Sequence, residues 1–170
     1  MLQLIGAVLL LCASATFGFL AVQGLKERVK QLHFLITALE EMERELHCRL
    51  TPMPELLAAL EARIPGPVGA FFSLCVSGLH NLGGRPFSKV WSEALEAADL
   101  HLEEGDRILV EELGSCLGRY DGQRQCDSIV QTRMRLEEHL ADAAEQRNRL
   151  GRVYGTLSLA AGAFLVIVLI

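Results

Sequence analysis

The sequence predicts an all-α protein, in which a cytoplasmic helical bundle with two long antiparallel stalk helices continues into N- and C-terminal transmembrane helices. Both ends of the 170-residue chain are apolar and uncharged. In the segments that adjoin these ends, apolar residues recur every three or four positions, which is typical of a helix buried along one face. No segment alternates apolar and polar residues for long enough to indicate a β-strand.

The uncharged ends predict two membrane-spanning helices. The first charged side chain is Lys26 and the last is Arg152. Residues 2–22 and 153–170 are each long enough to cross a hydrocarbon layer about 30 Å thick, since a helix rises about 1.5 Å per residue. The expected domains are a transmembrane helix over 1–25, a cytoplasmic helical bundle over 26–152 and a transmembrane helix over 153–170.

A cleaved secretory signal is the alternative interpretation of the N-terminus. Ala13-Ser14-Ala15 has the pattern of a cleavage site, and Cys12 is a candidate for lipid modification. However, no Lys or Arg precedes the apolar run, and Leu11 is too bulky for the small residue that precedes a lipid-modified cysteine. We therefore favour a retained membrane helix.

Basic residues close to the predicted spans set the expected orientation. Under the positive-inside rule, they place the middle of the chain in the cytoplasm, because no Lys or Arg lies on the far side. The odd number of cysteines, five, agrees with a reducing compartment. The basic residues are Lys26, Arg28, Lys30, Arg147, Arg149 and Arg152.

Two long helices, over 26–50 and 123–150, are expected to form the spine of the bundle, since neither contains Pro or Gly. The first is expected to end at Thr51-Pro52, where Thr51 caps the next helix and Pro52 takes its first position. The apolar stripes consist of Leu25, Val29, Leu32, Ile36, Leu39, Leu46 and Leu50 in the first helix and of Ile129, Leu136, Leu140, Ala143, Leu150 and Tyr154 in the second.

Four shorter helices are predicted between the two long ones, because Pro and Gly residues divide this part of the chain into short segments. Pro65-Gly66 and Gly83-Gly84 are expected to end the first two, and Gly118 is expected to cap the last. The expected helices cover 54–64, 68–82, 87–98 and 103–117.

The acidic charge is concentrated on the region of the short helices. Residues 51–121 carry 11 Asp or Glu and 5 Lys or Arg, a net charge of −6. This excess argues against nucleic acid as a partner. A basic protein partner is one explanation of the acidic surface, and an ordinary solvated helical surface is the other. The candidate partner surface consists of Glu55, Glu61, Glu103, Glu104, Glu111 and Glu112.

No catalytic residue, metal site or cofactor site is predicted. The cysteines and histidines lack the usual zinc-ligand spacings, and the sequence has neither a phosphate-binding glycine loop nor a nucleophile elbow. We interpret the cysteines as small buried hydrophobic residues, and a hydrolase or redox enzyme that uses Cys48 or Cys116 as the weakest alternative. The run of Glu40, Glu41, Glu43 and Glu45 is interpreted as a solvated outer face.

Small residues in the spans predict close helix packing in the membrane. Residues spaced by four on a helix share one face, and small side chains there let two helices approach closely. The two spans packing against each other is one explanation, and homo-oligomerisation or docking on another membrane protein is the other. The candidate packing residues are Ser14, Gly18, Gly155, Ser158 and Gly162.

Short motifs are distributed along the whole chain in a characteristic order and spacing. They are Gly6, Gly18, Glu27-Arg28, Gln31-Leu32, Leu39, Glu45, Thr51-Pro52, Trp91, Leu95, Leu117-Gly118, Asp121, Gln125, Tyr154, Leu157 and Gly162. Through them the sequence resembles the stage III sporulation protein AB family of endospore-forming bacteria. It departs from the family pattern at His47-Cys48, where an aromatic residue is common, and at Ser158, which replaces a glycine.

The resemblance implies a noncatalytic platform or scaffold subunit in the mother-cell membrane around the forespore. It would belong to the channel complex that links mother cell and forespore, with other stage III sporulation channel proteins as its partners. The family is similar to the cytoplasmic domains of the inner-membrane platform protein of type II secretion machines, which implies docking of a secretion-type ATPase. The alternative is a two-span membrane sensor or transducer with helical stalks, which the lack of an expected output domain disfavours.

Overall fold

The structure is a computed structural model of the chain. It describes the backbone of residues 2–48, 51–80, 85–117 and 122–169, and the side chains of residues 23–46, 51–80, 85–117 and 123–153. Within these residues the chain forms six α-helices and no β-strand, which confirms the predicted all-α class. The helices are α1 (Leu2–Cys48), α2 (Met53–Arg63), α3 (Gly66–His80), α4 (Phe87–Ala97), α5 (Glu104–Cys116) and α6 (Gly122–Leu169).

The four short helices begin and end within two residues of the predicted positions. One local prediction is wrong, because Pro52 rather than Thr51 is the N-cap of α2. The carbonyl of Pro52 accepts the first hydrogen bond of the helix from the N–H of Leu56 at 3.1 Å. The hydroxyl of Thr51 instead donates to Oε2 of Glu45 at 2.9 Å. The expected stops at Gly83-Gly84 and Gly118 lie outside the described residues.

The chain divides into two compact units. The terminal unit consists of Met1–Glu27 and Asp142–Ile170, and the bundle consists of Arg28–Ala141. Within the described part of the chain, no helix combines the length and the apolar character needed to cross a membrane. Apart from Val153, however, the side chains of the predicted spans are not among those described. The two-span topology therefore stays a prediction.

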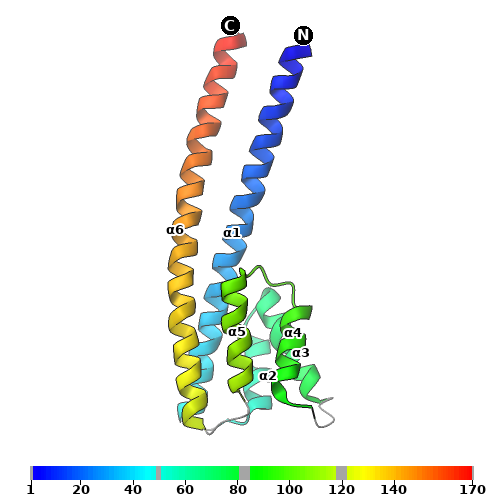
Figure 1. Ribbon diagram of the computed structural model, residues 1–170, viewed down its shortest axis with the longest axis vertical. Helices are drawn as coiled ribbons and strands as arrows, with labels where there is room; N and C mark the ends of the chain where they lie inside the picture. Colours follow the sequence, from blue (N-terminus) through cyan, green and yellow to red (C-terminus); the bar gives the residue numbers. More distant parts are fainter. Residues whose placement is uncertain (1, 49–50, 81–84, 118–121, 170) are drawn as a thin grey trace. The chain divides into compact units, whose positions relative to one another are not determined.

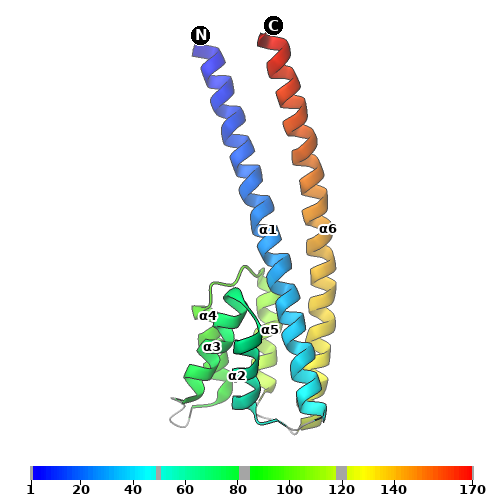
Figure 2. The same ribbon diagram turned by 180° about the vertical axis from the view of Figure 1, so that it is seen from behind.

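Within the bundle, the segments of α1 and α6 lie side by side and run in opposite directions (Figures 1 and 2). An ion pair joins them, with 3.4 Å between Oε2 of Glu43 and Nε of Arg133. Apolar side chains of the two predicted stripes are buried here, as expected for helices that face a common core. These buried residues are Leu32, Ile36, Leu39, Ile129 and Leu136.

The short helices enclose an aromatic core, which we define as Phe71, Phe72, Phe87 and Trp91. Along the chain, α2 contacts α3, α3 contacts α4, and α4 contacts α5. Trp91 is 1% exposed, and its ring meets that of Phe71 edge-on with 4.8 Å between centroids. Its indole N–H donates to the carbonyl of Val110 at 2.7 Å, so the polar atom of this large ring is satisfied. The core thereby joins α3, α4 and α5.

Gly114 allows α5 to approach Trp91 closely. A Cβ atom at this position would lie 2.0 Å from Cδ1 of the indole ring, a separation that real Cβ atoms do not show. Gly78 of α3 plays the same role toward Val90, where a Cβ would lie 2.4 Å from Cγ1. Both glycines are therefore required by packing rather than by backbone conformation.

Candidate functional site

The six candidate partner glutamates are exposed, but they fall into two separate groups. Glu55 and Glu61 lie on α2. The others belong to the N-terminal cap of α5 or to α5 itself. Helices α2 and α5, both fully described, do not contact each other. The candidate glutamates therefore belong to two helices that do not pack on each other, and their role as a partner surface stays a prediction.

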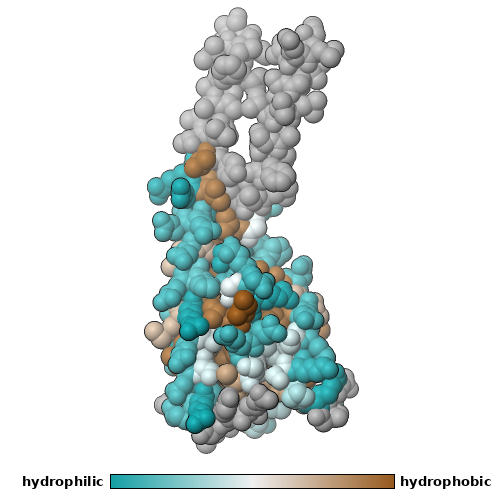
Figure 3. All heavy atoms as spheres, in the orientation of Figure 1, coloured by the Kyte–Doolittle hydropathy of each residue, from teal (hydrophilic) through white to brown (hydrophobic). Residues whose placement is uncertain are grey.

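The larger group forms an acidic helix face with an apolar residue in its middle. Glu104, Ile108, Glu111 and Glu112 are all exposed, and their spacing places them on one side of α5. Ile108 is 46% exposed. Figure 3, in the orientation of Figure 1, shows a small hydrophobic patch over α5 with hydrophilic residues around it. The opposite side of α5 carries buried residues, including Leu109 and Leu113, so the acidic face is held outward.

Glu103 differs from the other glutamates of this group, because it is already engaged within the chain. Its Oε1 lies 2.6 Å from Nη1 of Arg28 on α1, although its side chain is 60% exposed. As the N-cap of α5, Glu103 also donates its backbone N–H to Oδ2 of Asp106 at 3.1 Å. A basic partner at Glu103 would compete with Arg28.

Asp106 is the centre of a buried polar cluster that joins three helices. The carboxylate is 0% exposed and accepts hydrogen bonds from Arg28 of α1, through Nε at 2.8 Å and Nη2 at 3.1 Å. Nδ1 of His139 of α6 lies 2.6 Å from Oδ1 of the same carboxylate. We call Arg28, Glu103, Asp106 and His139 the polar clasp. It fixes α5 to both α1 and α6.

Electrostatics keeps Asp106 ionised despite its burial. Burial alone would raise the pKa of this carboxyl group, but hydrogen bonds from Arg28, His139 and the backbone of Glu103, together with the charge of Arg28, hold the pKa below its usual value of 3.8. An ionised Asp106 can only accept hydrogen bonds, so Nδ1 of His139 carries the proton between them. The clasp is therefore a charged cluster with directional contacts.

Sequence reasoning missed the clasp, although its residue Arg28 and the nearby Gln31 belong to motifs that carried the family resemblance. Arg28 and Gln31 are 7% and 2% exposed, respectively. The side chain of Gln31 accepts the backbone N–H of His101 at 2.7 Å. Polar residues on the buried side of the first stripe were the available signal, since buried charge requires a partner.

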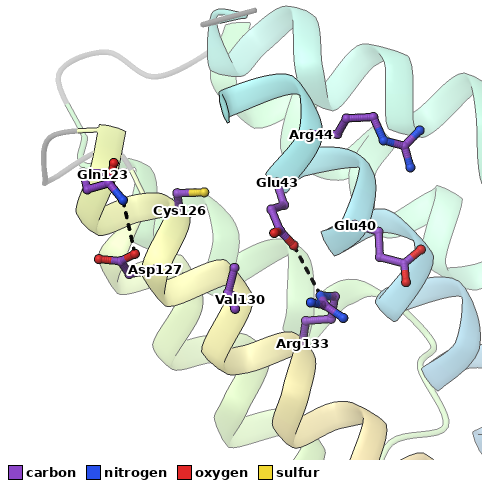
Figure 4. A pocket seen from close by; sticks show the side chains of 8 residues that line it. All are labelled: Glu40, Glu43, Arg44, Gln123, Cys126, Asp127, Val130 and Arg133. Carbon is purple, nitrogen blue, oxygen red and sulfur yellow. Dashed lines mark hydrogen bonds and ion pairs between the residues drawn. The ribbon is translucent and has the colours of Figure 1, made fainter. Parts of the chain in front are cut away.

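A mixed-charge groove lies between α1 and α6 in the bundle (Figure 4), with a volume of about 540 Å³. The Glu43–Arg133 ion pair crosses it, and the amide of Gln123 donates to Asp127 at 3.5 Å. Glu43 is therefore paired rather than simply solvated, contrary to the expected outer face. The groove is lined by Glu40, Glu43, Arg44, Gln123, Cys126, Asp127, Val130 and Arg133.

The buried cysteines remain protonated thiols. Burial raises the pKa of Cys75 to about 12. Burial, and then the nearby charges of Glu43 and Asp127, raise the pKa of Cys126. Because the thiolate is the nucleophile and the metal ligand, neither residue is poised for those roles. Among the side chains that the structure describes, no group of three or more His, Cys, Asp or Glu could hold a metal ion. The side chain of Cys48 lies outside them.

The candidate packing residues belong to the two predicted membrane helices. Ser14, Gly18, Gly155, Ser158 and Gly162 all lie outside the residues whose side chains and burial the structure describes. Their role in helix packing stays a prediction.

Comparison with known proteins gives one consistent result. A family model described as stage III sporulation protein AB matches residues 3–170. Stage III sporulation protein AB of Bacillus subtilis (strain 168) is 26% identical over 171 residues, which cover 99% of this chain and 99% of that protein. A solved structure of a stage III sporulation protein AB matches with a TM-score of 0.66 and 25% identity, over 72% of this chain and 98% of that one.

Proposed function

Since this chain belongs to the stage III sporulation protein AB family, we propose that it is a noncatalytic scaffold subunit of the channel complex between mother cell and forespore. In this role the bundle docks a cytoplasmic partner, a secretion-type ATPase being the leading candidate. Two terminal helices, over 2–22 and 153–170, anchor it in the mother-cell membrane around the forespore. Their uncharged sequences and the flanking basic residues support this topology.

The observation that carries the docking role is the exposed acidic face of α5. Glu104, Glu111 and Glu112 surround the exposed Ile108, while the opposite side of the helix packs on Trp91 and the core. Charged residues around a small apolar contact suit a basic partner surface, because the charges steer the encounter and the apolar residue adds buried area. We place the docking surface on α5 rather than on α2, because no large apolar residue of α2 is exposed.

Charge reversal on two helices tests this assignment. We compare three double variants with the same change in net charge: Glu104→Lys with Glu112→Lys on α5, Glu55→Lys with Glu61→Lys on α2, and Glu96→Lys with Glu145→Lys as the matched control. All six positions are exposed. We expect the α5 variant alone to weaken capture of the cytoplasmic partner by about tenfold or more, with unchanged helical content.

Site-specific photocrosslinking in sporulating cells identifies the partner. A photoreactive residue at Ile108 is expected to capture a protein that the same residue at Leu74 does not, although both positions are exposed, at 46% and 39%. Identical products from the two positions, or unchanged capture by the α5 variant, would remove the docking role from α5.

A further inference from the structure

The segment that joins α4 to α5 contributes very little to the apolar core. Of residues 99–106, only Leu100 and Asp106 are buried, and Leu102 is half-buried. Local opening requires exposure of buried apolar surface and loss of hydrogen bonds, so a segment with little buried apolar surface opens more readily than the core. We call residues 99–107, which combine this connection with the first turn of α5, the α4–α5 latch.

Polar contacts hold the latch to the helices on either side of it. Toward α1, Gln31 accepts the N–H of His101 at 2.7 Å, and Arg28 pairs with both Glu103 and Asp106. Toward α6, His139 contacts Asp106. Within the latch, the N–H of Arg107 bonds the carbonyl of Glu103 at 3.0 Å. The amides of His101, Glu103 and Arg107 therefore report whether the latch is closed.

We propose that the α4–α5 latch opens and closes as a unit, with the polar clasp as its fastening, while the aromatic core stays folded. Opening releases the N-terminal end of α5 from α1 and α6. The side chains of Glu103 and His139 are 60% and 34% exposed, so water and competing charged groups reach the clasp from outside. Trp91 has no such access, being 1% exposed.

The clasp can hold the latch closed in one geometry because its groups are charged and its hydrogen bonds are directional. A buried ion pair adds little net stability, since desolvation of the charges offsets their attraction, but it selects one geometry. Gly105 supports the same contact, because a Cβ there would lie only 3.3 Å from Cε1 of His139. A side chain at position 105 would therefore displace the His139 ring by a few tenths of an ångström.

Hydrogen exchange on the purified full-length chain in detergent tests the latch. The amides of His101, Glu103 and Arg107 are expected to exchange at least about tenfold faster than those of Trp91 and Ala94 in α4, because they open locally. His139→Ala is expected to accelerate the latch amides by a further factor of about ten and to leave those of α4 unchanged. His33→Ala, at an exposed histidine of α1, is the matched control.

Each outcome of this experiment decides the proposal. Emission of Trp91, the only tryptophan of the chain, verifies that the core of each variant is folded. Equal exchange rates in the latch and in α4 would show that the two open together. Latch amides whose exchange rates do not change in His139→Ala would show that the clasp does not hold the latch closed. Either result overturns the proposal. The measurement needs no partner protein, so its failure and that of the docking role are distinguishable.

Discussion

The aromatic core and the polar clasp solve the same problem, joining helices, by opposite means. In the core, Trp91 and Phe71 join α3, α4 and α5 through ring contacts and one satisfied indole N–H. In the clasp, Asp106, Arg28 and His139 join α5, α1 and α6 through charge and hydrogen bonds. Burial of apolar surface stabilises the fold but is not directional. Buried ion pairs are directional and select one arrangement of the helices, but they add little net stability. We therefore expect the core to supply most of the stability of the bundle and the clasp to select the arrangement of its helices.

The largest expected effect is in the core. Trp91→Ala removes a fully buried ring and leaves a cavity, so we expect the free energy of unfolding to fall by about 3–5 kcal/mol. Urea unfolding of the full-length chain, followed by circular dichroism, measures it. Phe87→Ala is the comparison variant, because Phe87 is only half-buried and lies 5.8 Å from Trp91 between ring centroids. Equal losses from the two variants would contradict a core centred on Trp91.

The second effect distinguishes the clasp from the core. Asp106→Ala removes the buried counter-charge of Arg28 and leaves it with the exposed carboxylate of Glu103, so we expect a loss of about 3 kcal/mol. The double variant Arg28→Met with Asp106→Leu removes both charges and is expected to recover most of that loss. A double-mutant cycle by urea unfolding provides the coupling energy. If the double variant were as unstable as the sum of the single variants, the clasp would be a stability element like the core.

The short helices were predictable because their boundaries depend on local residues. Pro52 and Pro65-Gly66 interrupt helices wherever the rest of the chain lies, and the predicted ends agree with the structure within two residues. The predicted cap of α2 was wrong, because the N-cap lies one residue later than expected: Pro52 is the N-cap, and the hydroxyl of Thr51 donates to Glu45. Local chemistry therefore predicts where helices begin and end better than it predicts which groups cap them.

The candidate site was only partly predictable for the opposite reason. The six glutamates are exposed, as expected from the net negative charge of residues 51–121. Arg28 and Asp106, however, are 78 residues apart in sequence, and Asp106 and His139 are 33 apart. No local pattern specifies pairs at such separations, so neither the engagement of Glu103 by Arg28 nor the separation of α2 from α5 was expected. Only the three-dimensional fold reveals which glutamates remain available to a partner.

The third effect is a smaller loss of stability at low pH, which is expected from the clasp and not from the core. The folded-state pKa of Asp106 lies below its usual value of 3.8, because hydrogen bonds and the charge of Arg28 outweigh burial. The carboxylate therefore stabilises the fold above the unfolded-state pKa, and this contribution is lost as the pH falls through the folded-state pKa. Between about pH 6 and pH 2, we expect the wild type to lose more stability than the Arg28→Met, Asp106→Leu double variant. Parallel pH profiles of the two proteins would exclude this contribution from Asp106.

The smallest effect concerns an ion pair outside both regions. Arg85 and Glu93 are 3.4 Å apart, and their side chains are 45% and 51% exposed. Water screens such a pair, and holding two long side chains in place opposes its attraction, so Glu93→Gln is expected to change the free energy of unfolding by less than about 0.5 kcal/mol. Asp106→Asn, the same chemical change in the clasp, is expected to cost several times more, because its charge is fully buried. Urea unfolding in low and high salt provides the comparison, since salt weakens the exposed pair and leaves the buried one nearly unaffected. Similar losses from the two substitutions would mean that burial does not distinguish the clasp from ordinary surface charge.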